Sequence, residues 1–256
     1  MRKIFLLLMI IFAVSGCGNN DKAVSQVGAI TQLNTTPQAG VTFFDNFNSM
    51  QMALASKNIA AIQTYGSVAK YMTANNSDFA IKDTQTVKLV DDFCCALRED
   101  DSDLKNNFDA AIDAMKSDGT LDALIDKYIT NFATPTPIDM PQIDGAEVIR
   151  VGITGDLPPL DLVLADGTPA GFNTAVLSEI GKRIGKNMEL VQVDSSARAA
   201  ALTSGQVDVI FWVVVPADDS GRPKDLDTPE GVSVTEPYYQ DTVVHVNLST
   251  LAGGFN

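Results

Sequence analysis

The sequence predicts an α/β fold in which helices cover mostly parallel strands. Short runs of β-branched and aromatic residues alternate with longer stretches that repeat apolar residues at helical spacing. A proline-rich stretch over residues 130–147 separates two such series. Strand–helix alternation favours parallel sheets with flanking helices. A hydrophobic content of 45% is enough to build a sizeable core.

The first series precedes residue 130. Phe47, Met50 and Leu54 lie on one helical face, and Asp118-Gly119 ends a later helix because glycine suits a left-handed C-terminal cap. We expect strands at Val27–Ile30, Val41–Phe44, Ile59–Ile62, Val87–Val90 and Phe93–Leu97, and helices at Asn46–Ser56, Ser67–Ala74, Ser102–Lys116 and Leu121–Ile129.

The second series follows a connector over residues 130–147 that is predicted to be ordered or semi-rigid. We expect its strands at Val148–Ile153, Met188–Val193, Val207–Trp212, Val232–Thr235 and Thr242–Val246, and its helices at Thr174–Ile184 and Ala197–Leu202. A polar loop is predicted at Ala217–Asp227.

Charge and cysteine content exclude several classes of function. The formal net charge of −14 argues against nucleic acid as a partner, which a basic patch would favour. His245 is the sole histidine and no CxxC pair exists, so neither a zinc site nor any cofactor is predicted. Cys94 and Cys95 are adjacent, and they are interpreted either as two buried small hydrophobes or as a strained vicinal disulfide.

The N-terminus has a basic start and an apolar run that is too short to span a bilayer. Residues 1–16 are therefore predicted to be a secretory signal. The sequence Val14-Ser15-Gly16-Cys17 resembles a bacterial lipobox, which implies lipidation of Cys17 and a tether over residues 17–23. The implied location is extracytoplasmic and membrane-anchored. An ordinary signal with a chance cysteine, or a buried helix, is the alternative.

Four segments together resemble parts of one protein family. Residues 148–160 (VIRVGITGDLPPL) resemble its opening strand and first pocket loop, and residues 166–173 (DGTPAGFN) its hairpin and first helix entry. Residues 201–210 (ALTSGQVDVI) resemble the helix, turn and strand that follow, and residues 235–239 (TEPYY) the exit from the first lobe. The family that these segments resemble is that of the bacterial extracellular solute-binding proteins for polar amino acids.

The order of the matching segments differs from that of the family. Residues 93–128 resemble its C-terminal helices and residues 27–74 its second lobe, yet both precede the opening strand. The resemblance therefore implies a circularly permuted, two-lobe periplasmic-binding-protein-like (type II) architecture. Lobe 2 would comprise residues 24–86 and lobe 1 residues 87–235, with residues 236–256 returning into lobe 2.

Two hinge crossings are expected, near Lys82–Val90 and Tyr238–Val243. In this arrangement residues 130–147 would join the usual C- and N-termini of the family. A single permuted chain, a monomer, is the favoured interpretation. The alternative is a dimer of two half-domains that exchange segments.

The resemblance implies a solute site between the lobes, at the carboxyl ends of the strands. The turn at residues 34–36 could bind a carboxylate through N–H and hydroxyl groups, or act only as a helix cap. Asp156 could accept from an ammonium group or be a solvated turn residue. The aromatic face of Trp212 could pack a solute stem or attract a cation, or Trp212 could be a core or lobe-packing residue. The candidate residues are Asn34, Thr35, Thr36, Tyr65, Asp156, Leu160, Phe211, Trp212 and Arg222.

Two departures from the family leave the solute class open. Thr64-Tyr65 stands where the family usually has an acid for the ammonium group. The strand through Val213–Pro216 lacks the arginine that usually binds the carboxylate, and the next arginine is Arg222, in the polar loop. Arg198, at a helix start, is interpreted as structural.

The predicted function is that of a solute-binding lipoprotein that delivers a small polar, amino-acid-like solute to the permease of an ABC transporter. A ligand-sensing or interaction subunit is the main alternative. A dehydratase-type enzyme on the same fold is a further one. No nucleophile elbow or Ser/His/Asp arrangement is present, and His245 is expected on a strand face, so the chain is not predicted to be an enzyme.

Overall fold

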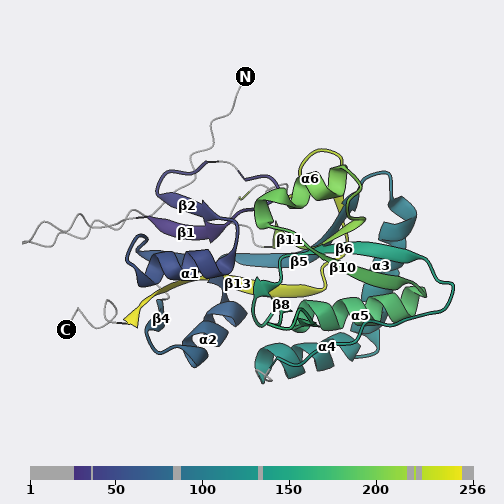
Figure 1. The fold of residues 1–256 in the computed structure, drawn as a ribbon, viewed down its shortest axis with the longest axis horizontal. Coiled ribbons are helices and arrows are strands. Elements are labelled where there is room, and N and C mark those ends of the chain that lie inside the picture. The colour runs from purple at the N-terminus through teal and green to yellow at the C-terminus, as the bar shows by residue number, and fades with distance from the viewer. Residues whose placement is uncertain are drawn as a thin grey trace, which may run out of the picture.

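The computed structural model describes residues 26–35, 37–82, 88–131, 135–217, 222 and 227–249. The predicted signal segment, the tether, Cys17 and Thr36 lie outside these residues. The described chain has the predicted α/β architecture, with a sheet of ten strands running through it and helices packed along that sheet (Figure 1). A separate sheet consists of three short strands.

One half of the main sheet, here called lobe 2, has the strand order β2–β1–β3–β13–β4. β1 pairs in parallel with β2 and β3, whereas β13 is antiparallel to β3 and β4. Its elements are β1 (Val27–Ile30), β2 (Val41–Phe44), α1 (Phe47–Ala55), β3 (Ala61–Tyr65), α2 (Gly66–Asn75), β4 (Phe79–Lys82) and the second part of β13 (Tyr239–Leu248).

The other half, lobe 1, repeats this pattern with the order β10–β6–β11–β5, and β12 also pairs with β5. β6 is parallel to β10 and β11, and β5 is antiparallel to β11. Its main-sheet strands are β5 (Val90–Arg98), β6 (Val148–Ile153), β10 (Asn187–Gln192), β11 (Val209–Pro216) and β12 (Val232–Val234).

Helices cover both faces of lobe 1 (Figure 1). α3, α4 and α5 contact one another, and α6 packs on β5, β6 and β11. The helical elements are α3 (Ser102–Ser117), α4 (Thr120–Ile125), the π-helix η1 (Asp126–Thr130), α5 (Phe172–Ile184), the 3₁₀-helix η2 (Ser195–Ala197) and α6 (Arg198–Thr203). The small sheet consists of β7 (Asp156–Leu157), β8 (Asp161–Val163) and β9 (Pro169–Ala170).

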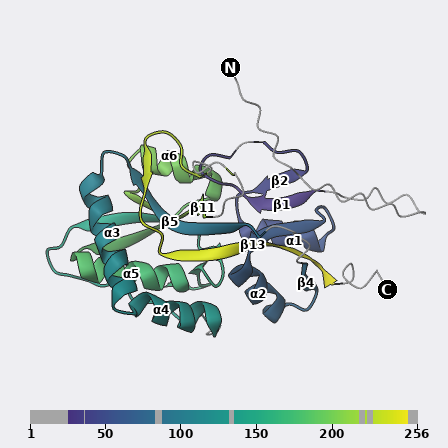
Figure 2. The ribbon, with the colours of Figure 1, turned by 180° about the vertical axis from the view of Figure 1, so that it is seen from behind.

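β13 connects the two lobes. Its residues Tyr239–Thr242 pair with β5, and its residues Val243–Leu248 pair with β3 and β4. Figure 2 shows β5 and β13 side by side across the middle of the molecule. The other predicted crossing falls between the end of β4 and the start of β5, and residues 83–87 lie outside the described residues.

The hydrophobic pattern explains the elements. Phe47, Met50 and Leu54 of α1 are fully buried on one helical face, as their spacing predicts. Cys94 and Cys95 have free, buried thiols in two separate clusters, because adjacent side chains on β5 point to opposite faces of the sheet. Gly119 takes the predicted left-handed conformation, with φ of 80°.

Several boundaries differ from the sequence prediction. Of the strand predicted at Val87–Val90, only Val90 lies in a described strand, and Val87 lies outside the described residues. Val90 begins β5, which includes the predicted strand Phe93–Leu97 because Asp91 and Asp92 also pair with β11. The strand predicted at Val207–Trp212 is β11, which continues to Pro216 through a β-bulge at Trp212. β4 was not predicted, and of the small sheet the sequence indicated only the hairpin that the resemblance implies near residues 166–173.

The connector is ordered along lobe 1 over its described residues 135–147, in which no helix or strand occurs. The backbone N–H of Ile138 donates to Pro169 O at 3.0 Å. The Asn187 side chain binds Ile143 twice, accepting from its N–H at 2.7 Å and donating to its carbonyl at 3.0 Å. These contacts hold the connector beside β9 and β10.

Gly171 fixes the loop between β7 and β8 against the start of α5. Its φ is 93°, and a Cβ there would lie 2.9 Å from the carbonyl oxygens of both Pro159 and Leu160. Phe172 and Asn173 donate their N–H groups to the same two carbonyls, at 2.9 and 2.8 Å. Only glycine permits this approach, so the position of Leu160 depends on it.

Gly171→Ala is expected to lower the free energy of unfolding by roughly 3–4 kcal/mol, from left-handed strain plus the backbone clash. Gly167→Ala is the matched control, because Gly167 has φ of 84° but no atom within 4 Å of the place that a Cβ would take. The control should lose only about 1–2 kcal/mol. Urea denaturation of both variants measures the difference, and equal losses would contradict this role of Gly171.

Candidate functional site

The carboxyl ends of the three parallel strands of lobe 2 meet lobe 1. The loop over residues 31–35 follows β1, α1 begins after β2, and α2 begins after β3. Backbone N–H groups at such strand and helix ends form anion-binding positions. In this structure a carboxylate of the chain itself occupies each of the three positions. We call this contact region the lobe interface.

Asp227 binds the loop after β1. Its fully buried carboxylate accepts from the backbone N–H of Leu33 in lobe 2 and, at 3.1 Å, from that of Val214 in lobe 1. Burial raises the pKa of Asp227 to about 6, and the charge of Arg198 opposes this rise. Leu33 also packs its side chain against a buried cluster of lobe 1. The loop is thus held to lobe 1 by polar and apolar contacts.

Asp156 binds the start of α1. Its Oδ2 accepts from the backbone N–H of Phe47 at 2.5 Å. Asn46 caps the same helix, because its side chain accepts from the backbone N–H of Ser49 at 2.8 Å. Burial raises the pKa of Asp156 to about 6, and the Phe47 N–H opposes the rise. Nearby, Ser195 N donates to Asp45 O at 3.1 Å.

Asp241, on the shared strand β13, binds the start of α2. Its Oδ2 accepts from Ser67 N at 3.0 Å and from Ser67 Oγ at 2.6 Å. The Tyr239 hydroxyl donates to the same oxygen at 3.3 Å. Asp241 therefore fixes the first turn of α2 beside the crossing strand.

Arg198 is the cation of the lobe interface, and its side chain is fully buried. Nη2 donates to Thr31 O of lobe 2 at 3.0 Å, Nη1 to Trp212 O at 2.8 Å, and Nε to Ser195 O at 3.3 Å. Its guanidinium carbon lies 4.7 Å from the centroid of the Trp212 ring. Trp212 is the bulged residue of β11 and has φ of 76°, an uncommon conformation for a bulky residue.

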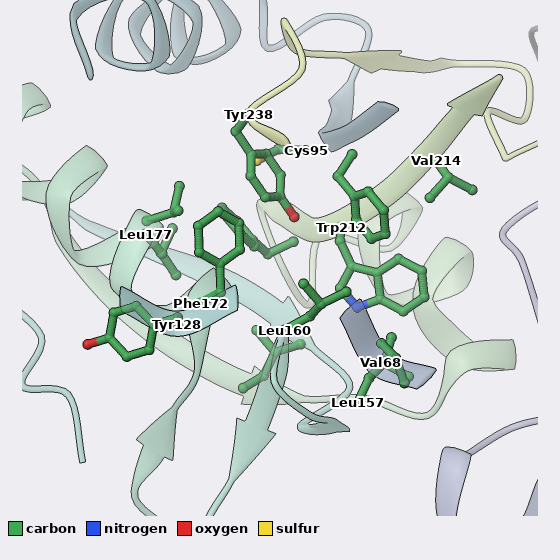
Figure 3. Packing of buried hydrophobic residues seen from close by; sticks show 14 of the residues in the cluster. Val68, Cys95, Tyr128, Leu157, Leu160, Phe172, Leu177, Trp212, Val214 and Tyr238 are labelled. Carbon is green, nitrogen blue, oxygen red and sulfur yellow. The ribbon is translucent and has the colours of Figure 1, made fainter. Parts of the chain in front are cut away.

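Apolar side chains of both lobes close the rest of the interface. They belong to one continuous buried cluster that includes Phe47 and Val68 of lobe 2 with Leu160 and Trp212 of lobe 1. Figure 3 shows the Trp212 indole beside Leu157, Leu160 and Val68. Trp212 is only 3% exposed, and its indole nitrogen has no hydrogen-bond partner of normal geometry among the described residues.

The structure brings only some of the candidate residues together. Asp156, Leu160 and Trp212 lie at the lobe interface. Phe211 is 1% exposed and packs on Tyr238, with ring centroids 4.9 Å apart. Asn34 is exposed, whereas the hydroxyl of Thr35 accepts from Gln32 N at 2.6 Å within its own turn. Whether any of them contacts a solute stays a prediction.

Tyr65 and Arg222 meet at Asp91 of β5, beside the crossing. Arg222 forms an ion pair with Asp91 at 2.8 Å and donates to Val90 O at 2.9 Å. The Tyr65 hydroxyl donates to Asp91 at 3.4 Å, and its ring lies 4.7 Å from that of Phe93. This arrangement ties the polar loop and the end of β3 to β5.

Sequence reasoning missed Asp227 and Asp241 and interpreted Arg198 as structural. Asp227 lies in a polar loop with other acids, and Asp241 is one polar residue in a strand, so neither stands out. Arg198 offers a usable signal, because it is the first residue of α6, a helix of small residues that packs against the sheet. A charged side chain is rarely buried there without a partner.

Other kinds of site find little support in the described part of the chain. No group of three or more potential metal-ligating side chains occurs there. A cavity of about 490 Å³ lies away from the lobe interface, between the connector and the β8–β9 hairpin, and its lining includes Ile138, Met140, Val163 and Leu190. None of the described helices is both long and apolar enough to span a membrane.

The fold and the lobe interface define a two-lobe α/β binding protein. The sequence model for bacterial extracellular solute-binding proteins, family 3, matches residues 31–131 and 149–249, well over half of the chain. The chain therefore belongs to this family of solute-binding proteins of ABC import systems. Comparison with curated proteins gives no match.

Solved structures of binding proteins are similar at low identity. The ligand-binding component of an ABC-type import system from Staphylococcus aureus, with zinc bound, has 11% identity and a TM-score of 0.45 over 91% of this chain and 68% of that one. A periplasmic substrate-binding protein of an ABC transporter from Coxiella burnetii has 9% identity and a TM-score of 0.40, over 90% and 87%.

A third similar structure is the binding protein AgaA, in complex with agropinic acid, from A. tumefacien R10. It has 15% identity and a TM-score of 0.39, and the match covers 72% of this chain but only 40% of that one. The chain thus spans well under half of the length of this protein.

The buried carboxylate of Asp227 predicts a pH dependence of stability. Its pKa of about 6 lies above its ordinary value of 3.8, so between these values the folded state binds more protons than the unfolded state. The stability it contributes is complete below pH ~4 and is lost as the pH rises through about 6. The total effect is roughly 3 kcal/mol.

Asp227→Asn removes this titration and supplies the control. Between pH 4 and pH 7, wild type should lose roughly 3 kcal/mol relative to the variant, as measured by denaturation at each pH. A constant difference between the two proteins across this range would contradict the burial of an ionisable Asp227.

Proposed function

We propose that this protein captures a small polar solute, of amino-acid-like size, between its two lobes and delivers it to the permease of an ABC transporter. The observation that carries the proposal is that three strand ends of lobe 2 meet carboxylates of lobe 1 and of the shared strand β13, in a chain of this family. Ligands of open α/β sheets bind at such carboxyl ends.

The lobes would open to admit a solute and close again to hold it. At the lobe interface Asp156 and Asp227 accept hydrogen bonds from lobe 2 and Arg198 donates one to it, and these bonds can form only when the lobes meet. A solute that adds contacts in this state shifts the population towards it. The two connections near Lys82–Val90 and Tyr238–Val243 would act as hinges, because hinge motion needs only a few terminal or loop residues.

A ligand-sensing or interaction subunit is the second candidate function. The observation that favours it is that the anion-binding positions at the strand ends hold carboxylates of the chain itself. An enzyme gains no support from the described residues, since His245 lies within the β13 ladder, opposite Gln63 and Lys82. A general acid or base must instead reach the substrate.

We also propose that the chain is a circular permutant of its family. Both lobes have three parallel strands and one antiparallel strand in the same order, although lobe 2 is interrupted between β13, near the C-terminal end, and β1, near the N-terminal end. A monomer in solution is expected for the permutant, and a dimer would favour exchanged half-domains.

We further propose that the protein is secreted and anchored by lipid at Cys17. This proposal rests on the resemblance of residues 14–17 to a lipobox.

A thermal-shift panel of natural amino acids, their amines and small aromatic acids tests the proposed function. A solute at about 100 times its Kd should stabilise the protein by ~2.7 kcal/mol and raise Tm by very roughly 5–10 °C. Trp212→Ala should abolish the shift, because the indole lies at the lobe interface.

Met52→Ala is the matched control for this experiment. Met52 is 72% exposed on α1, so its loss should leave both stability and solute binding unchanged. A shift that survives in Trp212→Ala would place the solute elsewhere. No shift with any solute, in a protein that unfolds cooperatively, would contradict solute capture from these classes.

A further inference from the structure

β10 is the outer edge of the main sheet in lobe 1, because it pairs on one side only, with β6. It has six residues and is the longest edge strand among the described residues, since β2 and β4 have four each and β12 has three. Natural edges usually avoid pairing with other chains by means of lysine, proline, a bulge or a short strand. β10 contains neither lysine nor proline, and its register with β6 is unbroken.

Three residues of β10 direct their backbone groups outwards from the sheet. Asn187 N donates to the carbonyl just before β6 at 2.9 Å, and Val193 N donates to the last carbonyl of β6 at 2.8 Å. Alternate residues of a strand direct their N–H and C=O groups to opposite edges, so those of Met188, Leu190 and Gln192 point away from β6. Outside the ladder with β6, these backbone groups form no hydrogen bond with any described residue.

The same three residues line the cavity of about 490 Å³ beside the connector. The connector is held at Asn187, at the start of β10, and at Asp139, whose carbonyl accepts from Ser178 Oγ of α5 at 3.2 Å. It forms no strand over its described residues and leaves the rest of the β10 edge unpaired. The cavity therefore lies beside an open row of backbone donors and acceptors.

The lining of the cavity suits apolar side chains of an added strand. Ile138 and Met140 of the connector and Val163 of β8 contribute to it, together with Met188 and Leu190. Its volume lies within the range of roughly 300–1,000 Å³ that ligand pockets have. Every second side chain of a strand points to the same face, so an added strand would place alternate side chains in this cavity.

Charge indicates what kind of segment fits this edge. Glu189 is exposed on the other face of β10, because its side chain alternates with those of Met188 and Leu190. A lysine or arginine on an added strand would pair with it across the edge. Asp139 is the only charged residue among the described residues that line the cavity. The formal net charge of −14 attracts a cationic segment and opposes a second copy of this chain.

We propose that the β10 edge is a docking site for an extended peptide segment of a partner protein, in which apolar and basic residues alternate. The segment would add to the sheet as a further strand, bound through the backbone of Met188, Leu190 and Gln192. These residues span ~13 Å, so about five residues of the partner would dock. In this mode of recognition main-chain hydrogen bonds provide affinity and side-chain pockets provide specificity. The site is separate from the lobe interface, so it does not depend on solute capture.

A short labelled peptide in which lysine and valine alternate tests the proposal by fluorescence anisotropy, without any solute. It should bind wild type saturably. Two N-methylated forms of it, one methylated at every valine and the other at every lysine, separate strand addition from apolar contact. The form whose methyl groups face β10 should bind at least about tenfold more weakly, and the other should bind like the parent. No saturable binding, or equal binding of the two forms, would overturn the proposal.

Leu190→Pro removes one outward N–H and no bond to β6, in the kind of position where edge strands tolerate proline. Leu190→Ala is the matched control, because it also loses the side chain but keeps the N–H. The proline variant should bind the peptide about fivefold more weakly than the alanine variant. Circular dichroism checks that both fold, and the N-methylated peptides carry the test on wild type if Leu190→Pro does not. Equal affinities of two folded variants would contradict strand addition.

Two further measurements test the nature of the occupant. A peptide with glutamate in place of lysine should bind at least about tenfold more weakly at low ionic strength, and equal binding would overturn the cationic class. Sedimentation of the protein alone tests a second copy as the occupant. A dimer that the lysine–valine peptide dissociates would show that the edge pairs with itself, and would overturn the assignment to a partner protein.

Discussion

The contacts between carboxylates and backbone N–H groups at the lobe interface are the constraint on which the arrangement of the lobes depends. Each parallel strand of lobe 2 ends in N–H groups that need acceptors, and Asp227, Asp156 and Asp241 supply them. Burial raises the pKa of Asp156 and Asp227, so keeping these two carboxylates charged at the interface costs free energy. The apolar cluster that spans both lobes must offset this cost.

The same interface combines closure with recognition. Arg198 links Thr31 of lobe 2 to Trp212 of lobe 1, and the bulge that rotates the Trp212 backbone turns its carbonyl toward the guanidinium. Local strain of this kind persists only where the surrounding structure enforces it, and it is concentrated at functional sites. In this protein the strained residue, which is the single tryptophan, is in direct contact with the buried cation that has no ion pair among the described residues.

The sequence predicts the fold well because periodicity and resemblance agree. Buried positions of α1 and the alternate faces of β5 follow directly from the pattern. The candidate site is predicted less completely. Asp156, Leu160 and Trp212 reach the lobe interface, whereas Arg222 pairs with Asp91, an acid far away in sequence. Asp227 and Asp241 could not be found, because the partners of Asp227 are backbone groups and Ser67, the partner of Asp241, is far away in sequence.

Fluorescence of Trp212, the only tryptophan, tests the central claim most directly: that the two lobes meet over a buried Arg198–Trp212 pair. The free protein should show the blue emission of a buried indole, with little quenching by iodide or acrylamide, since Trp212 is 3% exposed. Red emission with quenching as strong as in the unfolded chain would show that the lobes do not close over this residue and would contradict the account.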